Sequence, residues 1–452
     1  METLLLTLLF IHPSIPMLLL GFVLFIRSIS YGQSIKNTTQ NSNTDKENRA
    51  IKISLLSNYY EQDGNRSAIN GGLGSQALKS YAQDVNIYFP VKDSSALKIG
   101  GGVDYFTSAS LQDIDKGGNG KSVSGDETRK YANLGYDIGL SKGLSISPSI
   151  GISSEYDVTS TNTGLSVLKP IKKYNANFNS SLSFVLDRWM MVFPGEFRPV
   201  STDANTSASS NSSSSYAIPF TYKGSVLKKD GQLYPIDYRQ SYAFINNYSF
   251  VINQKMNAAV GLDLLMQTGL LSSPFNRVYF NDGVGDESVK EVRVENLPRE
   301  RQKIALSARY NYFANPFIVI RAHARYYTDS WGIKATTVAI EVPVKILKSL
   351  SITPFYRYHI QQASTHYRAY GQHVYKPGNY YTSDIDLGEF TAHKFGAGLR
   401  YVPFKKNADG AVTKKPMLTF KDVSVRYARY QRQDNLHADI ATLELNFEIN
   451  KR

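Results

Sequence analysis

Hydrophobic and polar residues alternate with a period of two along much of the chain. In segment 317–329, one set of alternate positions is apolar and the other is mainly basic. The apolar set is Ile318, Ile320, Ala322, Ala324 and Tyr326, and the other set is Val319, Arg321, His323 and Arg325. Successive side chains of a β-strand point to opposite faces, so this pattern predicts a strand with two different surroundings.

The same period recurs in the segments 142–157, 303–313, 349–360 and 440–449. No stretch beyond residue 32 combines a 3.6-residue period with helix-capping residues. The chain is therefore predicted to be all-β.

The predicted strands are long, and the links between them alternate in length. Soluble strands average about five or six residues, whereas a tilted strand needs about 9–11 to cross a bilayer; most runs here reach at least that length. Short links are predicted at 90–95, 141–143, 254–255, 314–316 and 346–349. Long polar loops are predicted at 61–79, 109–127, 158–171, 201–238, 271–299 and 362–386. Two links break this alternation, a short turn at 329–331 and a long segment at 404–416.

We predict sixteen strands and, as an alternative, fourteen. The predicted strands are approximately 49–60, 80–90, 95–108, 128–142, 143–157, 172–187, 190–200, 240–253, 256–269, 301–313, 317–329, 331–345, 349–361, 388–403, 419–432 and 436–449. The region 187–240 leaves the number open because "RWMMVFPGEFRPV" holds two prolines and no clean alternation. The Ser-rich segment 201–215 within it is expected to be a mobile loop tip.

A soluble sandwich and a membrane barrel both fit strands with one apolar face. A run of fourteen to sixteen long strands is harder to place in a soluble fold, and short turns that alternate with long loops are typical of outer-membrane barrels. We therefore predict a transmembrane, antiparallel, up-and-down β-barrel over residues 49–449, located in the bacterial outer membrane.

The N-terminal residues 1–32 are predicted to be a cleaved signal peptide. Their second apolar run, 17–26, has ten residues, which is too short to span a bilayer. Small residues at Ser30 and Gly32 fit cleavage before Gln33, although the usual basic n-region is missing. An uncleaved anchor helix is the competing interpretation. Residues 33–48 are polar and predict a flexible leader.

Composition narrows the possible chemistry. The chain has no cysteine, which excludes disulfides, thiolate metal sites and a cysteine nucleophile. The 31 tyrosines, against 2 tryptophans, suit girdles at a membrane interface. The net charge of +13 is spread along strands and turns, so no nucleic-acid partner is expected. Trp331, at a tight turn, is expected to anchor the barrel at the outer interface, with Asp329 and Lys334 as ordinary turn residues.

Basic residues gather on the polar faces of the strands between residues 300 and 430. The candidate lumen-facing, pore-lining residues are Arg309, Arg321, Arg325, Arg357, Lys394, Arg400 and Arg426. One interpretation is structural, with arginines that pair with acidic residues across strands and brace the wall. The other is a channel that attracts anions. The alternation of the sequence is compatible with both.

No other motif predicts a catalytic or metal site. The segment 113–120, "DIDKGGNG", begins like a calcium loop but fails at positions five and twelve, while Asp126 or Glu127 could still serve an oxygen-rich site. His359, His366 and His373 are spaced by seven, and the last two fall in a long loop. The chain has no Gly-x-Ser-x-Gly nucleophile elbow, so an enzyme, such as an outer-membrane hydrolase acting on lipid or saccharide, is only an alternative. No cofactor is expected.

Several segments resemble the domain-of-unknown-function 3570 family of bacterial outer-membrane proteins. They are "GGVDYFTSAS" (101–110), "LLSSPFNRVY" (270–279), "ENLPRERQKIALSARYNYF" (295–313), "RAHARYYTDSWGIKATTVAIEV" (321–342), "ITPFYRYHIQQAS" (352–364), "YYTSDIDLGEFTAHKFGAGLRY" (380–401) and "YARYQRQDNLHADIATLELNFEI" (427–449). The resemblance implies an outer-membrane barrel and no particular reaction or substrate. The last residue here is not aromatic, unlike the ends expected of family members.

The expected function is a pore, or an outer-membrane component of an export or transport system, with a polar and net-basic lumen. The expected partners are outer-membrane lipid, anionic solutes and periplasmic or outer-membrane proteins. The alternatives are a closed structural or receptor barrel with binding loops, and the barrel enzyme named above.

Overall fold

The computed structural model describes residues 50–92, 94–108, 126–197, 226–229, 232–281, 291–403 and 418–450. The predicted signal peptide, the flexible leader, the Ser-rich segment 201–215 and the calcium-like segment 113–120 lie outside the described residues. Among the helices of the described part, none has the length and apolar character to cross a membrane.

The described chain is built from strands. Their bounds are β1 Ala50–Asp63, β2 Leu78–Lys92, β3 Ser95–Ser108, β4 Asp126–Gly139, β5 Ser145–Ser154, β6 Val158–Ile171, β7 Ala176–Met190, β8 Val226–Lys229, β9 Gln232–Asn253, β10 Met256–Gly269, β11 Arg277–Tyr279, β12 Val292–Val294, β13 Glu300–Asn315, β14 Ile318–Asp329, β15 Lys334–Glu341, β16 Val344–Lys345, β17 Leu350–Gln361, β18 Phe390–Tyr401, β19 Leu418–Arg432 and β20 His437–Asn450. Short 3₁₀ turns are η2 Ala68–Asn70, η4 Ser141–Gly143, η5 Lys172–Tyr174, η6 Gly195–Phe197 and η7 Ile385–Leu387.

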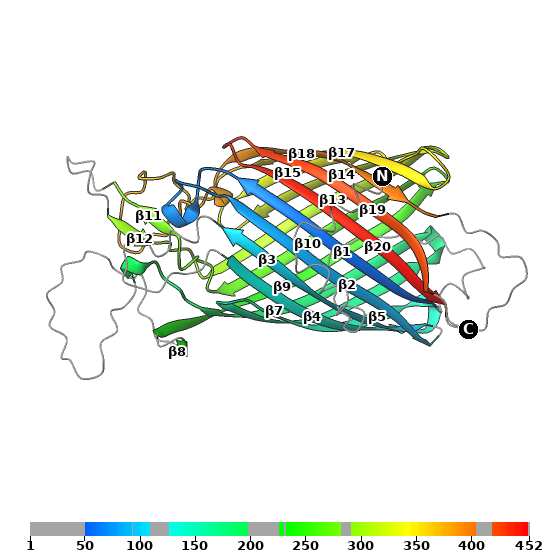
Figure 1. Cartoon of the computed structure of the whole chain (residues 1–452), viewed down its shortest axis with the longest axis horizontal. Coiled ribbons are helices and arrows are strands. Elements are labelled where there is room, and N and C mark those ends of the chain that lie inside the picture. The colour runs from blue at the N-terminus through cyan, green and yellow to red at the C-terminus, as the bar shows by residue number, and fades with distance from the viewer. Residues whose placement is uncertain are drawn as a thin grey trace, which may run out of the picture.

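Sixteen antiparallel strands form a closed barrel, as predicted (Figure 1). The first strand pairs with the last, from Ala50 opposite Asn450 to Asp63 opposite His437, which leaves no sheet edge in the wall. β15 and β16 are two parts of one wall strand, because both pair with β14 and β17. Pro343 lies between them, and proline has no N–H for the ladder.

The predicted number of strands is right, but two predicted elements are wrong. Residues 158–171, predicted to be a loop, form β6, which pairs along its length with β7. Of residues 190–200, predicted to be a strand, Met190 ends β7 and residues 191–197 leave the wall as buried loop structure around η6, while 198–200 lie outside the described residues. The two errors cancel in the count.

The two ends of the barrel differ, as the link lengths predicted. The ends of β1 and β20 meet at the end where most links are short, on the right of Figure 1. The opposite end carries the longer loops together with β8, β11 and β12 (Figure 1). We call these the short-turn end and the long-loop end. The links Glu155–Asp157, Ser330–Ile333 and Gln433–Leu436 are short exceptions at the long-loop end. The predicted long segment 404–416 lies outside the described residues.

The outer face of the wall is apolar. On β10, the alternate residues Val260, Leu262, Leu264 and Met266 are 36–50% exposed. On β13, Ile304, Leu306 and Tyr310 continue this surface. Exposed rows of large apolar side chains are expected where a barrel meets lipid, and they would be costly in water.

Trp331 is not an interfacial anchor, contrary to the prediction. Its side chain is only 3% exposed, its indole N–H donates to the Glu300 carbonyl, and the Arg301 guanidinium lies 4.2 Å from its ring centroid. Asp329 accepts from Arg301 and Tyr327 and from the backbone N–H of Trp331 and of Ile333. These contacts join the turn to the adjacent ends of β13 and β14 at the rim of the barrel.

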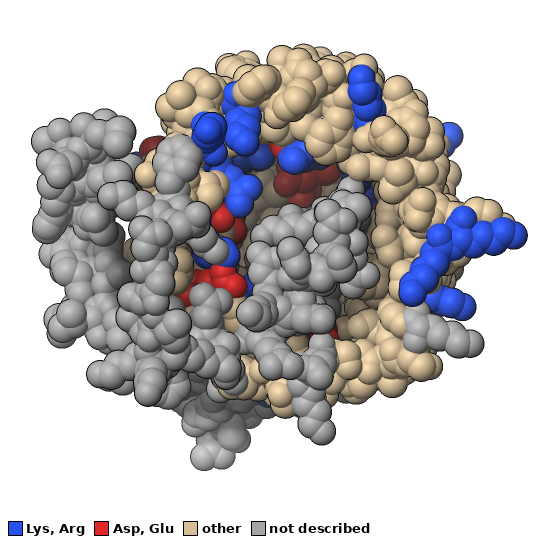
Figure 2. All heavy atoms as spheres, turned by 90° about the vertical axis from the view of Figure 1, so that its right-hand side faces the viewer, with Lys and Arg blue, Asp and Glu red and all other residues tan. Residues whose placement is uncertain are grey.

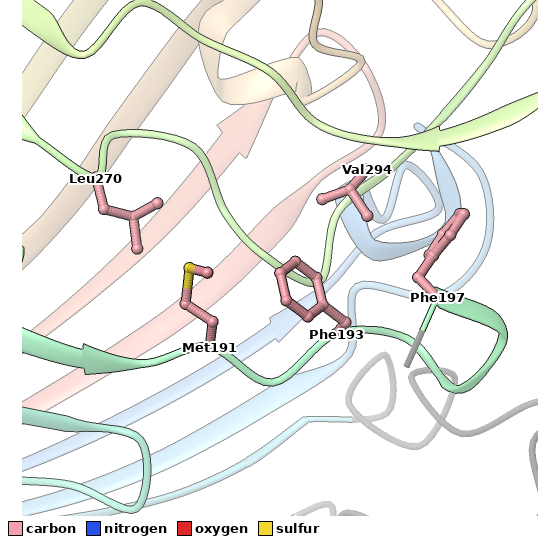
Figure 3. Close-up of a cluster of buried hydrophobic side chains, with 5 residues drawn as sticks. All are labelled: Met191, Phe193, Phe197, Leu270 and Val294. Atoms are coloured by element: carbon pink, nitrogen blue, oxygen red, sulfur yellow. The ribbon is translucent and has the colours of Figure 1, made fainter. Parts of the chain in front are cut away.

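Loop segments at the long-loop end pack into a folded body, which we call the loop cap. It comprises residues 64–77, 191–197, 270–281, 291–299 and 362–389. The eight largest fully buried side chains of the described residues all belong to it: Phe280, Met191, Val278, Val294, Thr382, Pro194, Pro274 and Ser383. Figure 3 shows one of its clusters, formed by Met191, Phe193, Phe197, Leu270 and Val294 from three segments of the chain. The loops predicted to be polar and simple therefore contain a packed core.

Candidate functional site on the inner wall

Four of the seven predicted basic residues form ion pairs. Arg321 and Arg426 both contact the Glu341 carboxylate, at 3.0 and 2.9 Å. Arg325 lies 3.0 Å from Asp263, and Arg400 lies 3.0 Å from Asp422. For these four residues, the structural interpretation is supported by their geometry.

The pairs identify the inner face of the wall. Arg426 is on β19 and Glu341 is on β15, with β17 and β18 between them. Arg325 on β14 likewise reaches across β13 to Asp263 on β10. In a closed barrel, side chains can meet across intervening strands most easily from the concave side. The polar row of each of these strands therefore faces inward.

The other three predicted residues, Arg309, Arg357 and Lys394, have no carboxylate partner among the described residues. They lie in one continuous register row: Arg309 is opposite His323, His323 opposite Ala339, Ala339 opposite Arg357, and Arg357 opposite Lys394. We call Arg309, Arg357 and Lys394 the cation row, which also passes through His323. Like charges directly opposite each other on neighbouring strands repel, so the row is a local concentration of uncompensated positive charge.

Several inward basic residues lie outside the predicted set, among them Lys98 and Lys303. Lys303 on β13 is opposite Asp329 in register, but Asp329 contacts Arg301 instead. Its alternation with Ile304 could have revealed it. His323, which lies between Arg309 and Ala339 in register, was not among the predicted pore-lining residues.

Inward carboxylates also line the opposite wall, in addition to Asp263, Glu341 and Asp422. In the ring of sixteen strands, β4 lies eight strands from β15 in either direction. β2, β3, β4 and β7 carry the inward carboxylates of Asp84, Asp104, Asp137 and Asp187, which pair with Tyr131, Arg129, Lys98 and Arg239. Figure 2 looks into the barrel from the short-turn end and shows basic and acidic side chains around a hollow.

A small hollow of about 170 Å³ adjoins the cation row. It is lined by Arg357, His359, Phe390, Ala392, Lys394 and Tyr430. All six are on the inward-facing rows of β17, β18 and β19, because Tyr356, Phe395 and Tyr427 on the alternate positions are exposed outside. A larger hollow of about 950 Å³ borders the outer face, where Leu182, Tyr242, Leu264 and Ile304 contribute apolar walls.

A buried glutamate joins three segments of the loop cap. Glu295, 2% exposed, accepts hydrogen bonds from the Ser273 backbone N–H (2.7 Å), the Asn276 side chain (3.5 Å) and the Thr382 hydroxyl (2.5 Å). Burial raises the pKa of Glu295, and these three hydrogen bonds oppose the shift. The glutamate therefore connects residues 291–299 to residues 270–281 and 362–389.

The environment of Asp384 predicts that the loop cap is sensitive to pH. Burial and the carboxylates of Asp386 and Glu295 raise the pKa of Asp384 from 3.8 to about 8, while Arg432 and the Asp386 N–H oppose this shift. A raised pKa means that the folded cap binds the proton more tightly than the unfolded chain does. The stabilisation that protonated Asp384 gives to the folded cap is complete below about pH 4 and is lost as the pH rises through about 8.

We therefore expect cap residues 362–389 to exchange their amide hydrogens more readily, after correction for intrinsic rates, at pH 8.5 than at pH 5. Hydrogen exchange with mass spectrometry measures this, and Asp384→Asn should flatten the pH dependence because an amide does not titrate. Protection that is equal at both pH values in the unmodified chain would contradict the assignment.

Other candidate ligands remain apart or form only partial sets. His359 hydrogen-bonds Thr337, His366 packs against Trp331 and Tyr380, and His373 bonds the Thr382 carbonyl. The structure thus does not join these three histidines in one site. The ligand oxygens of Glu127, Glu155 and Asp157 do lie within 4.8 Å of one another, and Arg129 reaches this cluster at Glu155.

The chain was compared with curated proteins, solved structures and family models. No curated protein matches the chain. Among solved structures, a bacterial polysaccharide outer membrane secretin is similar at 8% identity, over 90% of this chain and 99% of that one, with a TM-score of 0.45. A BenF-like porin from Pseudomonas fluorescens Pf-5 has 7% identity, coverage of 89% and 98%, and a TM-score of 0.38. A mutant of the ferric enterobactin receptor PfeA from Pseudomonas aeruginosa has 8% identity, coverage of 84% and 53%, and a TM-score of 0.41.

A family model gives the more specific match. It covers residues 106–446, which include most of the barrel wall, the cation row and most of the loop cap. This confirms the resemblance found in the sequence. The chain belongs to the family described as Protein of unknown function (DUF3570).

Proposed function

We propose that the protein is an outer-membrane pore that passes small solutes and prefers anions. The observation that carries this proposal is the cation row, in which Arg309, Arg357 and Lys394 have no carboxylate partner among the described residues. Charge on the wall of a narrow passage raises the local concentration of ions of the opposite sign. The four ion-paired arginines brace the same wall and contribute less to this effect.

The architecture of the barrel supports a location in the outer membrane and an aqueous channel through the lumen. The apolar outer face suits lipid, and a closed wall satisfies its backbone hydrogen bonds without water. Barrels of sixteen strands are wide enough to leave an aqueous channel. The expected partners are outer-membrane lipid, anionic solutes, and periplasmic or outer-membrane proteins that deliver or receive them.

A receptor barrel is the second candidate. The packed core of the loop cap supports it, since loops that are ordered and joined by buried hydrogen bonds can present a fixed binding surface. In this case the chain would fold and insert but conduct no steady current.

Neutralising the cation row tests the preference for anions. The triple variant Arg309→Gln, Arg357→Gln, Lys394→Gln should reduce the anion-to-cation permeability ratio on the order of tenfold at low salt. Each lost charge acts on ions that pass close to the lumen wall, and low salt screens this interaction least. The ratio follows from the zero-current potential of single channels under a KCl gradient.

The matched control preserves charge. Arg309→Lys, Arg357→Lys, Lys394→Arg keeps three cations in the row and should retain the unmodified ratio. A neutral triple variant that folds, conducts and keeps the original ratio would remove the cation row as the source of selectivity.

A further inference from the structure

We propose that the hollow beside the cation row is a binding site for small carboxylates that carry an apolar or aromatic body. It would make the lumen a selective passage rather than a general one. The inference deepens the proposed pore function, and the role of the site in transport rests on that function. Binding itself does not require that the barrel conduct ions.

The space comes from a small residue between long ones. Ala392 on β18 lies on the same inward row as Phe390 and Lys394 and is only 2% exposed. Its methyl group leaves the hollow of about 170 Å³ between the flanking side chains. At about 30 Å³ of liquid volume per water, that is room for a handful of waters or one small organic anion.

Two cations define the charged side of the hollow. Arg357 and Lys394 face each other in register on β17 and β18, and neither has a carboxylate partner among the described residues. An anionic group placed between them would relieve their repulsion. A guanidinium presents a planar fork of donors that fits a carboxylate with two hydrogen bonds, and an ammonium adds a mobile donor.

The other side of the hollow is apolar and aromatic. The Phe390 side chain is 8% exposed, and its ring lies 5.6 Å from the His359 ring and 4.8 Å from the Arg432 guanidinium. Tyr430, opposite Lys394 in register, contributes a second ring. A ligand that places a carboxylate at Arg357 and Lys394 and an apolar body against these rings matches both sides, whereas inorganic phosphate matches one.

The hollow lies where the loop cap joins the wall. The Gln361 side chain donates to the carbonyls of Asp386 and Gly388, each at 2.9 Å, and Arg432 contacts Asp386 at 2.5 Å. A solute that passes between the long-loop end and the lumen along this wall would therefore meet the hollow next to the loop cap.

Three small-molecule probes distinguish the contribution of the ligand's negative charge from that of its aromatic body. Saturation-transfer NMR on the folded full chain in detergent should show saturable binding of benzoate, weaker binding of acetate and weaker binding of benzyl alcohol. Arg357→Gln, Lys394→Gln should weaken benzoate binding by about tenfold or more, since hydrogen bonds to charged groups carry that range of effect. Ala392→Leu should weaken benzoate selectively and leave acetate little changed, because it fills the hollow and keeps both cations.

The control is Lys98→Gln, which removes an inward cation that pairs with Asp137 elsewhere on the wall, and it should bind benzoate as the unmodified chain does. Equal binding of benzoate and acetate, or unchanged benzoate binding in a folded Ala392→Leu variant, would overturn the site. The binding assay needs no current, so a silent barrel that binds benzoate would reject the pore and keep the site. A conducting, anion-preferring barrel without saturable benzoate binding would reject the site and keep the pore.

Discussion

Replacing Leu306 with arginine is expected to destabilise the inserted barrel by about 2–4 kcal/mol in a bilayer. Leu306 lies near the middle of β13 with 54% of its side chain exposed on the outer face, where the barrel account places lipid. An arginine near the middle of the bilayer on the lipid-facing side of a barrel carries this cost, which falls toward the interfaces. Denaturant titration of the barrel folded into lipid vesicles measures the free energy of unfolding.

The adjacent residue provides the control. Ser307 follows Leu306 on the same strand and faces inward, opposite Gly261 and Arg325 on the neighbouring strands. Ser307→Arg should cost much less in the bilayer, because the lumen face is polar. Equal costs at the two positions would show that the outer face does not contact lipid, and the membrane assignment would fail.

Replacing Glu295 with alanine is expected to open the loop cap while the barrel wall remains folded. The change removes the acceptor of three hydrogen bonds and leaves Ser273, Asn276 and Thr382 with buried donors that lack a partner. Each such donor costs about 1–3 kcal/mol, which is enough to unfold a local segment. Hydrogen exchange should rise sharply in residues 270–281 and 362–389.

Two measurements distinguish this from general destabilisation. Protection of the wall strands should stay close to that of the unmodified protein, and Glu295→Gln should have a smaller effect because its amide oxygen still accepts. If Glu295→Ala leaves the cap as protected as before, the hydrogen bonds of Glu295 do not hold the cap together.

The barrel could be predicted from the sequence because one physical pattern repeats in most strands. Lipid on one side and a polar lumen on the other impose a period of two, and the strands with strong apolar rows, such as β10 and β13, were found with nearly correct bounds. Strand β6 was missed because it lacks such an apolar row. Its sequence "VTSTNTGLSVLKPI" is rich in Ser, Thr and Asn, so its outward row has little apolar contrast and resembles a loop.

The loop cap was missed because its apolar residues lack a period. The run "MMVFPGEF" was assigned to a strand, and its Met191, Phe193 and Phe197 instead pack against Leu270 and Val294 from distant loops. Contacts between loops that lie far apart in the sequence leave no local signal. The same applies to Arg277, which reaches Glu196 and the Ile69 carbonyl.

The candidate site was predicted in part. Alternation placed seven basic residues on the polar faces of their strands, but it could not separate paired from unpaired ones. That distinction depends on which strands bring Glu341, Asp263 and Asp422 within reach of an arginine. Within the described part of the chain, Arg309, Arg357 and Lys394 are the predicted residues without such a partner. The small hollow also depends on register, since Phe390, Ala392 and Lys394 meet Arg357, His359 and Tyr430 only in the assembled wall.

The most direct test of the central claim is the zero-current potential of the unmodified protein, purified from outer membranes and inserted into a planar bilayer under a KCl gradient. A potential of the sign that chloride preference produces, carried by steady single-channel steps, is the result that the proposed pore predicts. A folded barrel that inserts without conducting, or that prefers potassium, would contradict the proposed anion-preferring pore.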